Sequence, residues 1–351
     1  MYLDSTSINK ICILSWGLIG DVFIRVPVIE AVKQRFPDAL IDVVVDPSSV
    51  GVLLNHPAIY RVIPYSRKKK PRLHYLFNSL RNLSILRGNA YDLCINLYCG
   101  GSSPVISRLS GARYRLSYNH TKALRWANNL QVETPSFCGN WVVALAKMLE
   151  PLGIESQLVR RGTSFYCTDV AEQKAAQLLD GVQRPLIGLN LGAGPEIKRW
   201  PIRAFLEMAE RLCKEYAVQF VLFTNPGMEQ LAEEFSDKFQ AAEKLQTLPV
   251  LSLDEVGAVM QHCAVMITGD TSLMHMSFGL KRPTLVLFTS TRPEVVEPED
   301  CLHADCFVED PTQTDACGNA LGSKDIPVNE VCEKFAMLAQ QTGLTPLRQM
   351  S

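Results

Sequence analysis

Two stretches decide the fold: ICILSWGLIGD at residues 11–21 and LIGLNLGAG at residues 186–194. Each begins with a short apolar run, breaks into a glycine-bearing turn and leads to a helix-like stretch, at 22–36 in the first half and 202–216 in the second. An apolar strand, a tight turn and an amphipathic helix form the start of a nucleotide-binding α/β half. The chain therefore predicts two similar lobes, with the polar residues of each turn facing a cleft between them.

Length and composition suit two globular domains. The chain has 351 residues, of which 47% are hydrophobic and 20% charged, which is enough apolar surface for two cores. The apolar runs are strand-sized, so no transmembrane helix is predicted, and the polar start MYLDSTSINK is unlike a secretory signal. We therefore expect a cytoplasmic protein whose 11 cysteines are mostly reduced.

One group of cysteines stands apart from those in apolar stretches. Cys301, Cys306 and Cys317 lie in a late acidic segment that is typical of a loop, and their spacing does not form paired CxxC units. Scattered thiols are the simpler interpretation, and a metal site remains an alternative.

The net charge of −1 hides a strongly basic segment. From Arg61 to Arg125 there are 13 Lys and Arg residues and one acid, Asp92, so this segment carries +12 and the rest of the chain −13. Such a field attracts phosphates, carboxylate-rich ligands or an anionic lipid surface, and a solvated face with counterions is the simpler alternative. No nucleic-acid recognition motif accompanies it, so no nucleic-acid partner is expected. Peripheral membrane contact is favoured by nearby aromatic and apolar residues: Tyr65, Leu73, Tyr75 and Phe77.

Strand-like and helix-like patterns alternate along both halves. Strands are expected at 11–14, 41–45, 62–65, 93–97, 186–191, 220–223, 265–267 and 285–288. Helical spacing appears between them, residues 294–325 are typical of a loop, and a final helix is expected at 328–341. This alternation predicts two parallel sheets with right-handed crossovers.

Polar residues follow the first strand of each half, where open parallel sheets bind ligands. Asp21 begins the first helix, either as a helix cap or as a general base that deprotonates an acceptor hydroxyl. In the second half, Gly192, Ala193 and Gly194 let backbone N–H groups approach a phosphate. Lys198 follows, in a position to reach the same phosphate and neutralise a leaving group.

Two further clusters follow later strands of the second half. Asp270, Thr271 and Ser272 begin a helix, as caps or ligand contacts, and His275 lies one turn further on, as a structural histidine or a phosphate or sugar contact. Glu229 begins another helix, where it suits the helix dipole or accepts hydrogen bonds from ribose hydroxyls. The glycine turn lacks the third glycine and the later acid of a dinucleotide fingerprint, which disfavours a dehydrogenase.

Three blocks together resemble the ADP-heptose:lipopolysaccharide heptosyltransferase family, glycosyltransferase family 9. They are SWGLIGDVFIRVPVIEAVKQRFPDALIDVVV (15–45), LIGLNLGAGPEIKRWPIRAF (186–205) and VMITGDTSLMHMSFGLKRPTLVLF (265–288). The resemblance runs in order from about Lys10 to about Pro298. It implies the GT-B architecture, two Rossmann-like lobes facing across a cleft, and heptose transfer from ADP-heptose to inner-core lipopolysaccharide with inversion, no cofactor and no obligatory metal.

The resemblance also implies roles for particular residues. The family's Gly-Asp turn falls on Gly20 and Asp21, which makes Asp21 the implied catalytic base. Its lysine before Trp-Pro matches Lys198, implied to contact the donor phosphates, and Glu229 is implied to hold the ribose. Its Asp-Thr-Gly-x-x-His motif falls on residues 270–275, implied to hold pyrophosphate and sugar, with Ser272 in place of the usual glycine. That serine either crowds the pyrophosphate or adds a hydrogen bond to it.

Domain limits and partners follow from the resemblance and the charge. We expect an N-terminal acceptor-binding domain at 1–165, a C-terminal nucleotide-sugar-binding domain at 166–326, and a C-terminal helix at 327–351 that returns to the first domain. The protein is expected on the inner face of the inner membrane, with an anionic lipopolysaccharide precursor as acceptor. The candidate acceptor-binding residues are Gly20, Arg25, Arg67, Lys68, Arg113 and Arg115.

Two other functions stay open at this point. One keeps the fold and uses another nucleotide sugar or a protein acceptor. The other is a non-catalytic relative that binds glycolipid or an assembly partner, for which Ser272 is the only support in the sequence.

Overall fold

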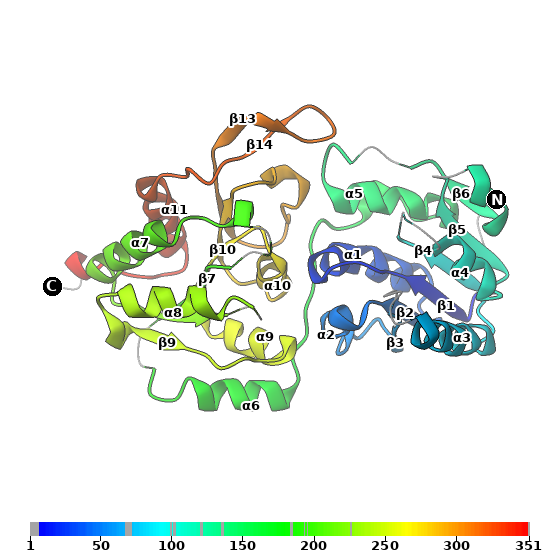
Figure 1. Ribbon diagram of the computed structural model, residues 1–351, viewed down its shortest axis with the longest axis horizontal. Helices are drawn as coiled ribbons and strands as arrows, with labels where there is room; N and C mark the ends of the chain where they lie inside the picture. The colour runs from blue at the N-terminus through cyan, green and yellow to red at the C-terminus, as the bar shows by residue number, and fades with distance from the viewer. Residues whose placement is uncertain are drawn as a thin grey trace. The chain divides into compact units, whose positions relative to one another are not determined.

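The computed structural model describes residues 7–66, 72–98, 100, 103–119, 122–134, 137–182, 185–192, 194, 196–224 and 227–349 (Figure 1). The chain divides into two compact units, Met1–Thr163 and Ser164–Ser351. None of the helices in this described part combines the length and the apolar character needed to cross a membrane.

The first unit is built on a six-stranded sheet in the order β3-β2-β1-β4-β5-β6, with every neighbouring pair parallel. The central strands are buried apolar runs because helices cover both faces of such a sheet. The strands are β1 (Lys10–Leu14), β2 (Leu40–Val45), β3 (Arg61–Pro64), β4 (Leu93–Asn96), β5 (Tyr114–Tyr118) and β6 (Leu130–Val132).

Helices lie on both faces of this first sheet (Figure 1). Alternate residues of β1 face opposite ways: Cys12 and Leu14 join a core cluster with Leu86 of α3 and Ile106 of α4. On the other side, α1 packs against α5 and α2. The helices are α1 (Ile19–Arg35), α2 (Val50–Leu53), α3 (Arg72–Gly88), α4 (Ser103–Leu109) and α5 (Trp141–Ala146).

The second unit repeats this strand order. Read from the β9 edge, its sheet runs β9-β8-β7-β10-β11-β12, again with all neighbours parallel. Two parallel sheets with helices between their strands confirm the predicted α/β class. The strands are β7 (Leu186–Asn190), β8 (Gln219–Phe223), β9 (Leu245–Thr247), β10 (Cys263–Gly269), β11 (Thr284–Phe288) and β12 (His303–Phe307), followed by an antiparallel pair, β13 (Glu309–Thr314) and β14 (Ala320–Gly322).

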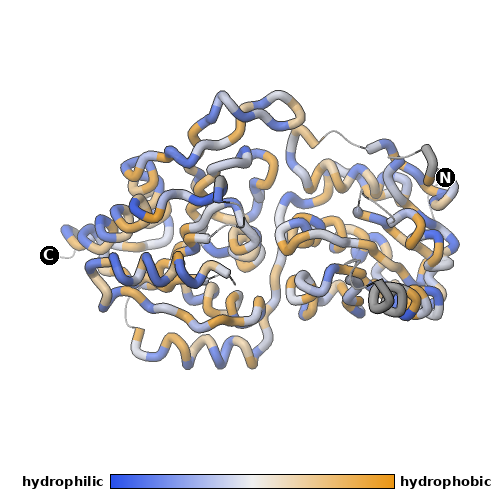
Figure 2. The backbone as a smooth tube through the Cα atoms, viewed as in Figure 1, coloured by the Kyte–Doolittle hydropathy of each residue, from blue (hydrophilic) through white to orange (hydrophobic). Residues whose placement is uncertain are grey.

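The helices of the second unit form one layer on each face of its sheet. One layer buries side chains of α7, α8 and α11 in a single core cluster, to which the mostly hydrophilic α8 contributes Phe235 (Figure 2). On the other layer, Met274 and Phe278 of α10 pack against Val286 and Phe288. The helices are α6 (Asp169–Leu178), α7 (Ile202–Glu215), α8 (Glu229–Lys238), α9 (Leu253–Gln261), α10 (Ser272–Gly279) and α11 (Val328–Gln341).

The last helix packs within the second unit. α11 lies on α7, β11 and β12 of that unit, and the expectation that residues 327–351 also return to the first domain stays a prediction. The apolar stripe of α11, including Val331, Phe335 and Leu338, is fully used by that core. The apolar face of the helix is therefore satisfied within the second unit.

Several strands were missed in the sequence, and they lie mostly at the sheet margins. β6, β9 and β12 are three of the four edge strands of the two six-stranded sheets, and they are only three to five residues long. Residues 294–325, expected to be a loop, contain β12, β13 and β14. Short, partly polar strands give a weak periodic signal, and their pairing depends on the neighbouring strand rather than on their own sequence.

Candidate active site

The candidate donor-binding residues of the second unit gather at the carboxyl ends of β7 and β10. These two strands are neighbours at the centre of the sheet, where the strand order reverses and where open α/β sheets bind ligands. Lys198 Nζ lies 3.0 Å from Asp270 Oδ2, although the residues are 72 positions apart. The structure therefore brings together two residues that were assigned to one phosphate site.

A threonine that the sequence did not point to joins this pair. The Thr291 hydroxyl donates to Asp270 and accepts from Lys198 Nζ at 3.4 Å. The Asp270 side chain is only 11% exposed. Burial alone would raise the pKa of Asp270, but the Lys198 charge and the Thr291 hydroxyl outweigh it, so that pKa is held below its usual range. Asp270 is therefore a carboxylate, and it holds the Lys198 ammonium in place.

A polar network orients the start of α10. Asn190, the last residue of β7, donates through Nδ2 to Thr268 Oγ1 at 2.9 Å and to Thr271 Oγ1 at 3.0 Å. Thr271 is the N-cap of α10 and accepts from Leu273 N at 3.3 Å. This helix end points its N–H groups and its positive dipole end at the edge of the sheet, an arrangement suited to an anion.

Ser272 and His275 occupy the first turns of α10. Among the described residues other than glycine, only Ala90 and Lys281 have positive φ, so Ser272 adopts its backbone conformation without strain. A glycine at this position would therefore provide space and not conformational freedom. His275 is buried. Burial raises the pKa of Asp270, and the interaction with His275 lowers it, to a smaller extent than Lys198 and Thr291 do.

The loop that carries Lys198 is anchored in the core by Trp200. The indole Nε1 donates to Ile326 O at 3.0 Å, and the ring packs edge-to-face on Phe205 with centroids 4.9 Å apart. Arg199 closes the loop by donating to Gly194 O at 3.0 Å. Gly192 N donates to Asn190 Oδ1 at 3.3 Å, and Ala193 lies outside the described residues.

Glu229 also lies at the carboxyl ends of the strands, at the start of α8 after β8. It is exposed and accepts from Gly227 N at 3.0 Å, and this bond lowers the pKa of its carboxyl. A very small pocket of about 10 Å³ next to it is lined by Gly192, Thr224 and Met228, among others. Glu229 is thus a carboxylate beside a pocket at the end of β7 and β8.

In the first unit, Asp21 sits in the first turn of α1, directly after the turn that ends β1. Its Oδ2 accepts from Leu18 N at 2.8 Å, so it does cap the helix. Gly17, at φ +152°, lies so close that an added Cβ would be 2.6 Å from Asp21 Oδ2. Asp46 and Ser49 hold this turn from the neighbouring strand end, by contacts of 3.0 and 3.1 Å to Gly17. Glycine is therefore required at position 17 for space and for backbone conformation.

The candidate acceptor residues do not all lie together. Gly20 and Arg25 belong to α1, and Arg25 donates to Trp16 O in the turn before Asp21. Arg67 and Lys68 lie outside the described residues, three and four positions after β3 ends.

Arg113 and Arg115 are placed differently from what we expected. They flank the amino end of β5, where Arg115 pairs with Cys94, whereas Asp21 follows the carboxyl end of β1. The Arg115 guanidinium also donates to Ala112 O at 2.6 Å and Ala127 O at 2.9 Å. Our placement of these two arginines near Asp21 is therefore corrected: they lie at the amino ends of the parallel strands, opposite the carboxyl ends. The strand register, and not the charge, determines this position.

The structure adds residues that sequence reasoning missed. Asn190 and Thr268 carried a signal, since each is a polar residue at the end of an otherwise apolar parallel strand. Thr291 carried none, because only the tertiary structure places it between Lys198 and Asp270. The suggested cysteine site is not supported either: among the described residues the one group of metal-type side chains is Glu297, His303 and Asp305.

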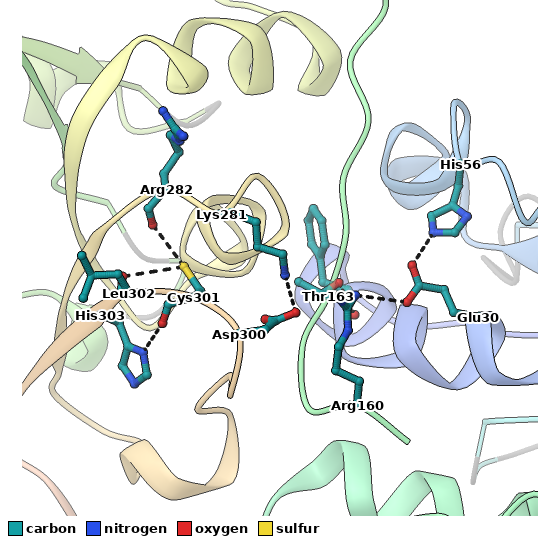
Figure 3. Close-up of polar contacts among 11 residues, drawn as sticks. Glu30, His56, Arg160, Thr163, Lys281, Arg282, Asp300, Cys301, Leu302 and His303 are labelled. Carbon is teal, nitrogen blue, oxygen red and sulfur yellow. Dashed lines mark hydrogen bonds and ion pairs between the residues drawn. The ribbon is translucent and has the colours of Figure 1, made fainter. Parts of the chain in front are cut away.

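The segment that ends the first unit is tied to α1. Pro27 inside α1 has no N–H, so the carbonyl of Phe23 lacks its helical donor, and the Thr163 hydroxyl supplies one at 2.9 Å. Nearby, Glu30 of α1 contacts His56 Nε2 at 3.2 Å and Arg160 at 3.5 Å (Figure 3). The helix that carries Asp21 therefore also holds the end of its unit.

Comparison with known proteins identifies the family of the chain. The family model for glycosyltransferase family 9 (heptosyltransferase) matches residues 80–313. The chain belongs to glycosyltransferase family 9. This family 9 chain is 28% identical over 283 residues to lipopolysaccharide heptosyltransferase 3 of Escherichia coli, covering 78% of this chain and 81% of that protein. It is 23% identical over 310 residues to lipopolysaccharide heptosyltransferase 2 of E. coli K12, covering 82% and 85%.

Solved structures share the fold of this family 9 chain. The glycosyl transferase family 9 structure from Veillonella parvula DSM 2008 superposes with a TM-score of 0.80 at 19% identity, covering 95% of this chain and 97% of that one. The E. coli ADP-heptose lps heptosyltransferase II structure gives 0.77 at 19% identity, covering 95% and 99%. The predicted family is confirmed, and the protein is a glycosyltransferase enzyme.

Proposed function

We propose that this family 9 glycosyltransferase moves heptose from ADP-heptose to an anionic inner-core lipopolysaccharide acceptor, with inversion at the anomeric carbon. The observation that carries the proposal is the cluster of Lys198, Asp270 and Thr291 beside the start of α10. A cation held next to a helix N-terminus is suited to a diphosphate. The relatives named lipopolysaccharide heptosyltransferase support heptose as the sugar.

The donor would be held by both features of the second unit. The N–H groups at the start of α10 and the Lys198 ammonium bind the diphosphate, and Glu229 accepts hydrogen bonds from the ribose hydroxyls. As the bond from the anomeric carbon to the phosphate oxygen breaks, negative charge grows on that oxygen. Lys198 stabilises this charge, so ADP leaves without needing a proton.

The acceptor would be activated by Asp21. Its Oδ2 is held by Leu18 N, which leaves Oδ1 to take the proton of an acceptor hydroxyl. The acceptor oxygen, as it loses its proton to Asp21, then attacks the anomeric carbon from the face opposite ADP, and this attack inverts that centre. Arg25 of α1 is the described candidate contact to acceptor phosphates and carboxylates, and Arg67 and Lys68, which lie outside the described residues, are proposed for this role from their charge in the sequence alone.

An isosteric substitution tests this assignment. Asp21→Asn should lower kcat by at least 100-fold and leave the Kd for ADP within about twofold, because the carboxylate acts on the acceptor and not on the donor. Asp38→Asn, which changes an exposed carboxylate of the same unit, is the matched control and should retain kcat. Wild-type turnover by Asp21→Asn would exclude Asp21 as the base.

The donor assignment has a separate test. A thermal-shift panel of ADP, UDP and GDP should show stabilisation by ADP, by roughly 2.7 kcal/mol at a hundred times its Kd. Stabilisation by UDP or GDP alone would replace ADP-heptose by another nucleotide sugar.

Peripheral attachment to an anionic membrane on the cytoplasmic side is the remaining part of the proposal. α4 packs against α3 and against the short helix Lys122–Ala127. These three elements expose the apolar side chains of Leu80 and Trp126 and the basic side chains of Arg81, Arg87 and Arg108. Tyr65, which we expected at this surface, is instead buried against Trp16. Binding to vesicles containing anionic lipid should weaken as salt rises; binding insensitive to salt would contradict an electrostatic attachment.

A further inference from the structure

Three side chains of the kind that bind metals gather in the second unit, away from the candidate active site. Glu297, His303 and Asp305 each offer one ligand atom, and these atoms all lie within 4.8 Å of one another. All three residues are partly buried. No role in sugar transfer falls on any of them.

Strand geometry explains why two of the three meet. His303 and Asp305 are two positions apart on β12, so their side chains point to the same face of the sheet. His303 pairs with Thr284, the first residue of β11, so it lies at the amino end of that strand pair. Asp270 follows the carboxyl end of β10, and it therefore lies at the opposite end of these parallel strands. The group is therefore separate from the phosphate site of the same unit.

The orientation of His303 leaves one ring nitrogen for a ligand. Nδ1 lies 2.9 Å from Cys301 O, and because a carbonyl only accepts, Nδ1 carries the proton (Figure 3). In the neutral ring the lone pair is then on Nε2, which lies 3.7 Å from Asp305 Oδ2. A backbone carbonyl that fixes the distal nitrogen in this way is the usual support of a metal-binding histidine.

The segment before His303 is itself held firmly. Cys301 Sγ donates to Arg282 O at 3.3 Å, and Lys281 Nζ pairs with Asp300 at 2.7 Å (Figure 3). The ring of His303 packs edge-to-face on Phe278, with centroids 5.8 Å apart. The imidazole is thus preorganised by contacts on both sides.

The surroundings of the Asp305 carboxyl group favour a bound cation or proton. Its Oδ1 is buried and makes no hydrogen bond with any residue that the structure describes, and the side chain is 17% exposed. The carboxyl of Glu297 interacts with it as a like charge, and His303 and Lys334 are the nearby groups that can offset this charge. Two carboxyl groups and an imidazole lone pair therefore share a space in which acceptors outnumber donors.

We propose that Glu297, His303 and Asp305 bind one divalent transition-metal cation of the Zn²⁺ type. Imidazole with carboxylates favours such ions over Mg²⁺, which prefers oxygen ligands and keeps its waters. Ligands about 2.1 Å from a tetrahedral Zn²⁺ lie about 3.4 Å apart. Ligand atoms that lie within 4.8 Å of one another therefore need to approach by at most about 1.4 Å. The ion would link the loop that carries Glu297 to β12, and water would complete its coordination.

Calorimetric titration of the chelator-treated full-length protein with Zn²⁺ tests the site. Wild type should bind one equivalent, and the isosteric variants Asp305→Asn and Glu297→Gln should each bind at least tenfold more weakly. Glu299→Gln removes a carboxylate from the same loop and should bind as wild type. Lys334→Gln removes a nearby positive charge and should bind more tightly.

Two further readouts separate a metal site from a purely structural cluster. Zn²⁺ should raise the Tm of wild type but not that of Asp305→Asn, whose Tm without metal should be at least that of wild type, because a buried unpaired oxygen is removed. With Co²⁺ as the probe, the absorption spectrum should lack a thiolate charge-transfer band, since the ligands are nitrogen and oxygen. The proposal would be overturned by the absence of saturable Zn²⁺ binding, by wild-type Zn²⁺ affinity in Asp305→Asn and Glu297→Gln, or by a thiolate band in the Co²⁺ spectrum.

Discussion

Gly17→Ala is a sharp test of how the first unit positions its carboxylate. The added Cβ would lie 2.6 Å from Asp21 Oδ2 and 2.7 Å from Asp21 Cβ, so the Asp21 side chain must move by about half an ångström or more to relieve the contact. Residue 17 also has φ +152°, which costs a side-chain-bearing residue about 1–3 kcal/mol. Because Asp21 is the proposed base, a displacement of this size is expected to lower kcat by roughly 10- to 100-fold.

The assay separates this displacement from simple loss of stability. ADP release at saturating substrates gives kcat, calorimetry gives the Kd for ADP, and urea unfolding gives the stability. Gly111→Ala is the matched control, because Gly111 also has positive φ, +78°, but an added Cβ would meet only Arg87 Cγ at an ordinary 3.8 Å. Both variants should lose stability, and only Gly17→Ala should lose kcat while keeping its affinity for ADP. Wild-type kcat in Gly17→Ala would refute the reasoning.

Three more predictions concern side chains that the tertiary structure brings together. Thr291→Val should weaken ADP binding by roughly fivefold in calorimetry, because Asp270 then relies more on Lys198 and leaves it less available; an unchanged Kd would contradict this. Because the pKa of Asp270 is lowered in the fold, its ionised carboxylate stabilises the folded state above the usual carboxyl pKa, and this stabilisation is lost as the pH falls. Asp270→Asn should therefore flatten the fall in Tm below about pH 4, and an unchanged slope of Tm against pH would contradict this. Thr163→Val should lower the free energy of unfolding by about 1 kcal/mol in urea at constant m, because the Phe23 carbonyl loses its donor, whereas Thr163→Ser should not.

The residues of the candidate site differ in how well the sequence pointed to them. Asp21, Lys198 and Asp270 follow apolar runs and precede helical patterns, and the structure places all three at carboxyl ends of central strands. Arg113 and Arg115 were chosen for their charge, and charge carries no information about which end of a strand a residue occupies. Their strand, β5, was itself not expected, so their register could not be read.

The sequence by itself determined the two α/β starts and the family, because those signals are local: an apolar strand, a glycine turn and a helix start lie within about twenty residues of one another. Tertiary structure decided the contacts between distant segments. It places Thr291 between Lys198 and Asp270, Thr163 on the carbonyl that Pro27 leaves open, and Glu297 beside β12. It also decided that α11 completes the second unit, since only the pairing of strands and the packing of helices determine where an apolar stripe is buried.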